Sequence, residues 1–216
     1  MAFDPKKKLV SLTFDDGPNT TITPKVLDLL EEHGIVASFF LIAASITDES
    51  AKVARRAFEM GCEINNHTVH HEMMAQMTPE EIRREIDPCT EAVLRITGTP
   101  PRFFRPPYIN VSKTLFDNVA LPFICGIGCE DWGPSVSAEE RARRILSDPR
   151  DGDLYLLHDM PGNENTVEAL KTVIPELKAR GFDFATCGQL FDARGVTPVR
   201  GRLYYNVLQT EDRVTL

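Results

Sequence analysis

The stretch KLVSLTFDDGP at residues 8–18 places an apolar run directly before two adjacent carboxylates and a Gly-Pro turn. The run from Leu9 to Phe14 has the length and apolar character of a buried strand. Because neighbouring side chains of a strand point to opposite faces, Asp15 and Asp16 cannot both continue one face. We therefore expect the strand to end here and to present two carboxylates that diverge and do different work.

Similar runs recur along the chain, each followed by a longer helical pattern. We expect the further strands at 37–42, 62–66, 103–105, 121–127, 153–157 and 182–186. A capping-box signature begins one helix at Thr78 and Glu81, and glycines are expected to end helices at positions 34, 61, 98 and 181. The alternation predicts a parallel sheet with covering helices, either open and doubly wound or closed into a barrel. The stretch after Arg194 is less regular, and we expect it to pack across the outside.

Length and composition set broad limits on the function. The chain has 216 residues, of which 42% are hydrophobic and 26% charged, and no linker divides it, so we expect one domain over residues 1–216. The formal net charge of -8 argues against nucleic acid and anionic membrane as main partners. No signal-peptide pattern opens the given chain, which predicts a cytoplasmic protein unless the sequence is trimmed. The oligomeric state is not fixed by the sequence, and a monomer is compatible with it.

We interpret the cysteines and three of the arginines as structural residues without a role in the function. Five cysteines without a C-x-x-C pair argue against a disulfide framework or a four-cysteine zinc site, and a bridge between Cys125 and Cys129 is not expected. Arg141, Arg143 and Arg144 lie in a helical pattern and are interpreted as part of a solvated helix face.

Reactive residues follow five of the expected strands. They are Asp15 and Asp16, then His67, His70 and His71, then Arg105 and Tyr108, then Asp131 and Trp132, and last His158 and Asp159. Four of the five histidines are among them, and the opposite strand ends carry none. Because the active sites of parallel α/β proteins form at the carboxyl ends of strands, this clustering indicates an enzyme.

The histidines after the third strand suggest a metal. His67 and His71 are four apart, which on a helical turn puts both imidazoles on one face. Two histidines and one carboxylate leave open positions for water, as in a catalytic zinc site, and Asp16 is the natural third ligand. His70 is the alternative partner for His67, but we prefer His71 and interpret His70 as a bystander.

Two other functions remain open from these residues alone. The same three donors form the facial triad of non-haem Fe(II) oxygenases. The strand-helix rhythm weighs against that function, by analogy of fold. A non-catalytic binding module could use the same strand ends, although the gathering of carboxylates and histidines suited to acid, base and metal-ligand roles argues against it.

Five short motifs together resemble one known family. They are TFDDGP at 13–18, HTVHH at 67–71, FRPPY at 104–108, DW at 131–132 and LLH at 156–158. In this order they cover nearly the whole chain and resemble the polysaccharide deacetylase family (carbohydrate esterase family 4, NodB-homology domain). The resemblance implies a distorted (β/α)7 barrel with parallel strands, an active site at the carboxyl strand ends, and a divalent metal held by Asp-His-His.

The resemblance also implies roles for the first three motifs. Asp15 matches the general base, and Arg105 matches the arginine that orients it. Asp16, His67 and His71 match the metal ligands. Zn2+ is the expected metal, although Co2+, Mn2+ and Ni2+ accept the same ligands. Such a metal lowers the pKa of bound water from ~15.7 towards ~7 and polarises the acetyl carbonyl.

The remaining motifs complete the expected reaction. The backbone N–H of Tyr108 matches the oxyanion donor. His158 matches the general acid, and Asp131 supports it by favouring the imidazolium. Trp132 is expected to wall the pocket, and Leu156 to line the acetyl site. The resemblance therefore predicts hydrolysis of acetyl groups from a carbohydrate polymer or oligomer.

Two departures from the family pattern bear on the substrate. Ile109 stands where many members have glycine, and a bulky residue there is expected to narrow or reshape the groove. The stretch CGIGCE at 125–130 lacks the aspartate-rich pattern of amino-sugar deacetylases. Both features look more like the acetylxylan-esterase branch, but O-acetyl and N-acetyl substrates stay open. A polymeric substrate also implies a secreted or cell-wall protein, in tension with the missing signal.

Overall fold

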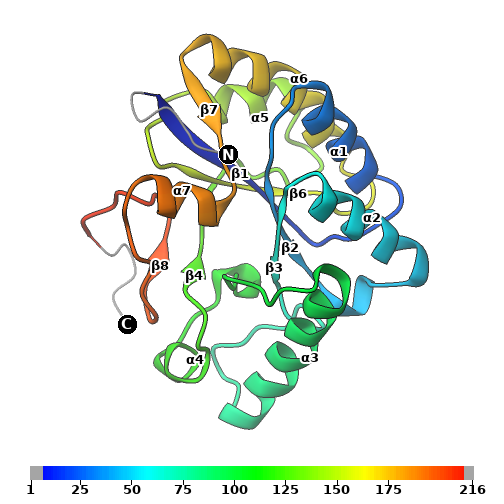
Figure 1. Ribbon diagram of the computed structural model, residues 1–216, viewed down its shortest axis with the longest axis vertical. Coiled ribbons are helices and arrows are strands. Elements are labelled where there is room, and N and C mark those ends of the chain that lie inside the picture. The colour runs from blue at the N-terminus through cyan, green and yellow to red at the C-terminus, as the bar shows by residue number, and fades with distance from the viewer. Residues whose placement is uncertain (1–6, 212–216) are drawn as a thin grey trace.

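In the computed structural model, which describes residues 7–211, β1 (Lys8–Asp15) lies in the middle of the sheet (Figure 1). Its carboxyl half pairs with β2 (Ser38–Leu41), and its first residues pair with β7 (Phe182–Phe184). β6 (Leu154–His158) runs along its other side. All these pairings are parallel, as the sequence predicts. Every β1 residue after the first is buried, which explains why the run is apolar on both faces.

Five strands follow one order across the sheet, β3-β2-β1-β6-β5, with β3 at Glu63–Asn66 and β5 at Ile127–Gly128. A separate parallel pair is formed by β4 (Phe123–Ile124) and β8 (Leu203–Tyr204). Phe104 forms isolated bridges to β3 and β4 and so joins the two groups. The described strands thus make a curved parallel structure whose regular pairing does not form a complete ring.

Three of the sequence-based predictions about strands were wrong. The expected strand at 103–105 contributes only the bridge at Phe104, because the prolines that follow at 106 and 107 have no N–H to continue a ladder. The run at 121–127 divides into β4 and β5 at Gly126, which has a φ of 85°. The stretch after Arg194 supplies β8 instead of only covering the outside.

Helices surround the strands (Figure 1). They are α1 (Thr23–Glu32), α2 (Asp48–Glu59), α3 (Pro79–Thr97), α4 (Lys113–Asn118), α5 (Ala138–Ile145), α6 (Glu164–Ala179) and α7 (Cys187–Ala193), with short 3-10 turns at Ala43–Ser45 and Pro107–Ile109. The capping box of Thr78 and Glu81 is confirmed. The glycines at 34, 61, 98 and 181 all have left-handed φ values between 60° and 89°, as expected for residues that end helices.

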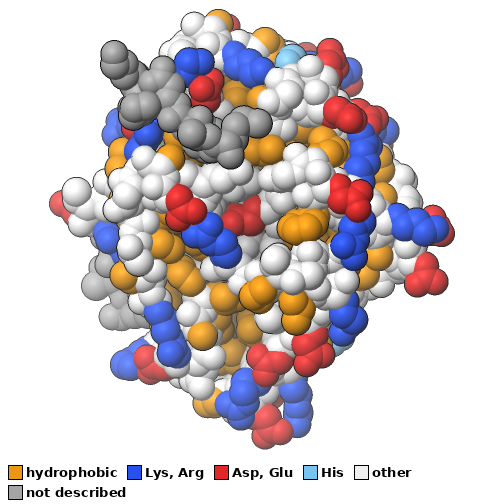
Figure 2. All heavy atoms as spheres, in the orientation of Figure 1, with side chains coloured by type: hydrophobic (Ala, Val, Ile, Leu, Met, Phe, Trp, Pro, Cys, Tyr) orange, Lys and Arg blue, Asp and Glu red, His pale blue; other side chains and the backbone are white. Residues whose placement is uncertain are grey.

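The interior and the surface agree with the composition. All five cysteines are buried, and no disulfide joins any two of them. Acidic and basic side chains are interspersed over the face seen in Figure 2. Among the described residues, no helix combines the length and apolar character needed to cross a membrane.

The predicted reactive residues lie together at the carboxyl ends of the strands. Asp15 and His158 are the last residues of neighbouring strands and are paired in register. Asn66 ends β3 and leads into the histidine loop, and Arg105 follows the Phe104 bridge next to it. Because parallel strands all end on the same side, residues far apart in the chain meet there.

Candidate active site

Asp15 is held by a buried arginine. Arg105 has no exposed surface and donates from one guanidinium nitrogen to Asp15 Oδ1 (2.5 Å) and from the other to Thr13 Oγ1 (2.8 Å). Its Nε donates to the carbonyl of Ile124 (3.1 Å), and the guanidinium lies over the ring of Phe40 (4.2 Å to the centroid). With four contacts from one side chain, Arg105 fixes the direction of the Asp15 carboxylate.

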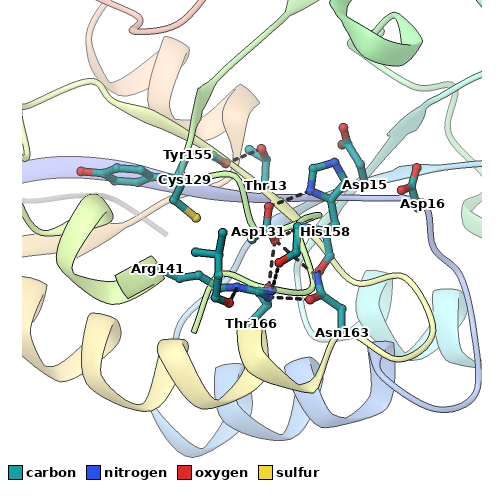
Figure 3. Close-up of polar contacts among 12 residues, drawn as sticks. Thr13, Asp15, Asp16, Cys129, Asp131, Arg141, Tyr155, His158, Asn163 and Thr166 are labelled. Carbon is teal, nitrogen blue, oxygen red and sulfur yellow. Dashed lines mark hydrogen bonds and ion pairs between the residues drawn. The ribbon is translucent and has the colours of Figure 1, made fainter. Parts of the chain in front are cut away.

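Asp16 follows Asp15 at the end of β1 (Figure 3) and approaches the same imidazole, since Asp15 Oδ2 also lies 3.6 Å from His67 Nε2. The Asp16 φ of 74° is left-handed, so the chain leaves the strand geometry at this residue. Asp16 Oδ1 lies 3.5 Å from His67 Nε2 and 3.4 Å from His71 Nε2. That oxygen is buried and has no hydrogen-bond partner. A buried carboxylate oxygen between two imidazole nitrogens, with no donor of its own, fits a bound cation.

The hydrogen bonds and charges around the two imidazoles also fit a cation. His67 Nδ1 lies 2.7 Å from the carbonyl of Arg105 and donates to it, so that Nε2 is the nitrogen that faces Asp16. Burial and the nearby His67 lower the pKa of His71, against the opposite effect of Asp16 and Asp15. Burial opposes ionisation of Asp16, but the neighbouring His67, His158 and His71 outweigh it and lower its pKa. The ligand atoms of Asp16, His67 and His71 all lie within 4.8 Å of one another.

The route by which His67 and His71 meet differs from the expectation. Residues 67–71 form an irregular loop and no helical turn, because Thr68 and His71 have left-handed φ values of 71° and 61°. The helical-spacing argument was therefore wrong, although the two residues do converge. His70 lies outside the cluster, with its side chain 62% exposed and its Nδ1 2.7 Å from Glu85 Oε1.

His158 and Asp131 form a second polar unit beside the carboxylates (Figure 3). His158 Nδ1 lies 2.8 Å from Asp131 Oδ1, and the His158 backbone N–H donates to Asp131 Oδ2 (2.7 Å). Burial, the largest influence, opposes protonation of the imidazole. The hydrogen bond and charge of Asp131, with the charges of Asp15 and Asp16, outweigh it and raise the pKa of His158 to about 9. With Nδ1–H given to Asp131, Nε2 is the nitrogen left for a substrate.

Behind Asp131 lies a buried network that the sequence analysis missed. Thr166 Oγ1 donates to Asp131 Oδ2 (2.9 Å), and Arg141 donates to both Asn163 Oδ1 (2.5 Å) and Thr166 Oγ1 (2.8 Å). The interpretation of Arg141 as a solvated helix residue was wrong, because only 2% of it is exposed. Its position in a helical pattern of alternating charges carried no signal that this one arginine faces inward.

Aromatic and apolar side chains border these polar groups. Tyr108 is 63% exposed and contacts His71 edge-on, with ring centroids 4.6 Å apart. Trp132 is 52% exposed and meets the His158 ring at 5.8 Å. Leu156 is nearly buried on β6, two residues before His158. These residues lie where the sequence places them, and their contacts with substrate stay predictions.

The turn that carries Tyr108 is anchored to the core. Tyr108 and Ile109 both have left-handed φ values, 56° and 51°, which is unusual for a β-branched residue such as Ile109. Ile109 is half-buried and packs against the apolar cluster that contains Phe104 and Leu115. The core therefore holds this turn in shape. The expected effect of Ile109 on the groove stays a prediction.

Glycine is required at position 17 because of the neighbouring side chain of Asp159, for which the sequence suggested no role. A Cβ at Gly17 would lie 2.7 Å from Asp159 Oδ2. Asp159 is fully buried, and Thr23 Oγ1 donates to its Oδ2, while its Oδ1 has no partner. Burial raises the pKa of Asp159 to about 7, against the hydrogen bond from Thr23, and the charges of Asp16 and Asp15 add to the rise. The pair Asp159 and Thr23 thus supports the turn that follows Asp15 and Asp16.

Comparison with known proteins agrees with this geometry. The family model for polysaccharide deacetylase matches residues 3–121. This chain belongs to the polysaccharide deacetylase family. A family 4 acetyl xylan esterase from Clostridium thermocellum, solved in complex with a cobalt ion, is 42% identical with a TM-score of 0.90, over 94% of this chain and 100% of that one. The Xyl-CE4 domain of a multidomain xylanase from the hindgut metagenome of Trinervitermes trinervoides is 39% identical with a TM-score of 0.91, over 94% of this chain and 98% of that one.

Two curated relatives of the deacetylase family are much longer than this chain. It is 44% identical to a bifunctional xylanase/deacetylase of Pseudobutyrivibrio xylanivorans over 93% of its length, but spans only 33% of that protein. It is 32% identical to the peptidoglycan-N-acetylglucosamine deacetylase PgdA of Listeria monocytogenes over 85% of its length, and spans 39% of that protein. The predicted family and its parallel α/β fold are confirmed.

Proposed function

We propose that this chain is a metal-dependent hydrolase that removes acetyl groups from a polysaccharide or oligosaccharide. One observation carries the proposal. A buried, unpartnered oxygen of Asp16 faces two imidazole nitrogens, with the Arg105-bound Asp15 on one side. Membership of the polysaccharide deacetylase family supports the same reaction.

Asp16, His67 and His71 would hold the metal. A divalent metal bound there lowers the pKa of a water molecule and polarises the acetyl carbonyl. Zn2+ is the metal we propose, because it prefers two imidazoles and a carboxylate with open positions for water. Co2+, which the Clostridium esterase holds in its crystal structure, Mn2+ and Ni2+ suit the same donors.

Asp15 and His158 would move the protons. Asp15 Oδ1 is engaged by Arg105, so Oδ2 is the oxygen available to accept a proton from the attacking water. His158 Nε2 would protonate the leaving oxygen or nitrogen, with Asp131 holding the ring and favouring its charged form. The backbone N–H of Tyr108 would donate to the developing oxyanion, a contact whose loss costs on the order of 3 kcal/mol in similar sites.

Among acetylated carbohydrates, we propose acetylxylan as the first substrate. A xylanase/deacetylase and an acetyl xylan esterase are each more than 40% identical to this chain, against 32% for the peptidoglycan deacetylase PgdA. Exposed Tyr108 and Trp132 beside the histidines suit an extended sugar chain, because aromatic faces pack against sugar rings. N-acetylated glucosamine polymers are the second candidate, since the same acid, base and metal ligands serve an amide.

The test is acetate release from acetylxylan and from N-acetylated chito-oligosaccharide, with and without a chelator. Wild type is expected to release acetate from acetylxylan, to lose this activity in chelator, and to regain it with added Zn2+ or Co2+. Asp15→Asn keeps the size of the side chain and is expected to bind metal but to lose most activity. Activity that survives both the chelator and this substitution would refute the mechanism.

The same assay distinguishes the two alternative functions. Oxygen uptake with bound iron and no acetate release would support the Fe(II) oxygenase, which the family membership disfavours. Carbohydrate binding that is unchanged in Asp15→Asn, with no acetate release from wild type, would support the non-catalytic module.

A further inference from the structure

The loop at residues 67–71 is held by a complete set of hydrogen bonds. The His67 N–H donates to the carbonyl of Leu41 (3.0 Å), and the Thr68 N–H donates to Asn66 Oδ1 (2.8 Å). The His71 N–H donates back to Thr68 Oγ1 (2.9 Å). These three contacts leave the two central N–H groups of the loop to find an acceptor elsewhere.

Glu85 on α3 supplies one acceptor for both of these N–H groups. Its Oε2 accepts from the N–H groups of Val69 (3.1 Å) and His70 (2.8 Å), and its Oε1 lies 2.7 Å from His70 Nδ1. Only 7% of Glu85 is exposed, which is unusual for a carboxylate without a Lys or Arg partner. A glutamate buried at this point is therefore committed to the loop backbone.

The loop needs this support because of its shape. Thr68 and His71 have left-handed backbones, a conformation that is unfavourable for residues other than glycine. Glu85 binds the two residues between them. Without it, the N–H groups of Val69 and His70 would lose their acceptor in a partly buried place, and the loop would relax towards an ordinary backbone.

We propose that Glu85 is a positioning residue that sets the metal affinity of this site. It does not touch the metal position. It holds the loop so that His67 Nε2 and His71 Nε2 both face Asp16 Oδ1, at 3.5 Å and 3.4 Å. The His70 side chain contacts the other oxygen of Glu85, Oε1. We expect this contact to contribute less to the metal affinity, because it does not involve a backbone N–H group of the loop. This inference rests on the proposed metal site.

The test is isothermal titration of Zn2+ and of Co2+ into the metal-free protein, for wild type and four variants. Glu85→Ala removes all three contacts and is expected to weaken metal binding by about 10–100-fold. Glu85→Gln keeps an oxygen that can accept from the two N–H groups, and is expected to recover most of the affinity. His70→Ala keeps the backbone contacts and is expected to bind nearly as wild type does.

Glu81→Ala is the matched control. Glu81 lies one turn earlier on α3 and caps that helix through Thr78, so its loss weakens the helix without touching the loop. Circular dichroism and thermal unfolding of the metal-free proteins will show that each variant is folded at the titration temperature. A purely structural role of Glu85 predicts a lower Tm for Glu85→Ala and Glu81→Ala alike, with unchanged metal affinity in both.

The outcomes separate this inference from the proposed function. If wild type binds metal and Glu85→Ala binds equally well, the positioning role is wrong and the deacetylase proposal stands. If wild type binds neither Zn2+ nor Co2+, both are wrong. Should Glu85→Ala not fold, Glu85→Asp takes its place, because the shorter side chain withdraws the carboxylate from the N–H groups of Val69 and His70. A positioning role then requires that Glu85→Asp binds metal more weakly than His70→Ala does, and equal affinity would overturn it.

Discussion

Replacing Arg105 by methionine should strongly destabilise the protein. Methionine keeps an unbranched stem against Phe40 but removes the charge and every donor. Asp15, with 2% of its surface exposed, would keep its carboxylate without the 2.5 Å contact from the guanidinium. Thr13 Oγ1 would lose its donor as well. A buried carboxylate left alone in this way is among the most costly single changes that a fold can suffer.

The expected loss is about 3–5 kcal/mol of unfolding free energy. Against a total of about 5–15 kcal/mol for an ordinary domain, the variant would lose a large part of its stability. For a chain of this size, each kcal/mol corresponds to about 2–4 °C, so the Tm should fall by about 6–20 °C. The double variant Arg105→Met with Asp15→Asn removes both charges and should recover part of this loss.

Urea denaturation followed by circular dichroism, in chelator so that bound metal does not contribute, measures the change. Arg102→Met is the control, since Arg102 forms an exposed ion pair with Asp192 (3.1 Å, side chains 47% and 65% exposed). Its loss should cost about 0.2–1 kcal/mol. The reasoning fails if Arg105→Met is as mild as Arg102→Met, or if the double variant is no more stable than Arg105→Met alone.

Two further predictions concern protonation and packing. Since the pKa of His158 lies near 9, above its ordinary 6.5, its contribution to stability is complete below pH 6.5 and is lost as the pH rises to 9. Asp131→Asn should abolish that decline in pH-dependent unfolding and move the alkaline limb of the acetate-release profile to lower pH; an unmoved limb would exclude His158 as the acid. Gly17→Ala should cost about 1–3 kcal/mol in thermal unfolding, because its Cβ meets Asp159 Oδ2 at 2.7 Å. The same change in an Asp159→Ala background should cost clearly less, and equal costs would show that this contact is not the cause.

Local chemistry made much of the fold predictable. The apolar run before Asp15 predicts a buried strand, and Gly17 with Pro18 predicts its end. In the structure this strand is β1, which ends at Asp15. The capping box at Thr78 and the helix-ending glycines depend only on residues a few positions away. The alternation of a strand does not reach Asp16, because β1 ends at Asp15 and Asp16 has a left-handed φ of 74°.

The contacts that make the site depend on residues far apart in the chain. Arg105 reaches Asp15 across 90 positions, and Glu85 holds a loop that begins 18 positions before it. Arg141 is buried while Arg143 on the same helix is exposed, because α5 packs against α6 and Asn163 meets the Arg141 guanidinium there. Periodicity reports which side of an element is apolar, but not which element covers it. The order of strands in space, and the burial that comes with it, decides which polar groups meet.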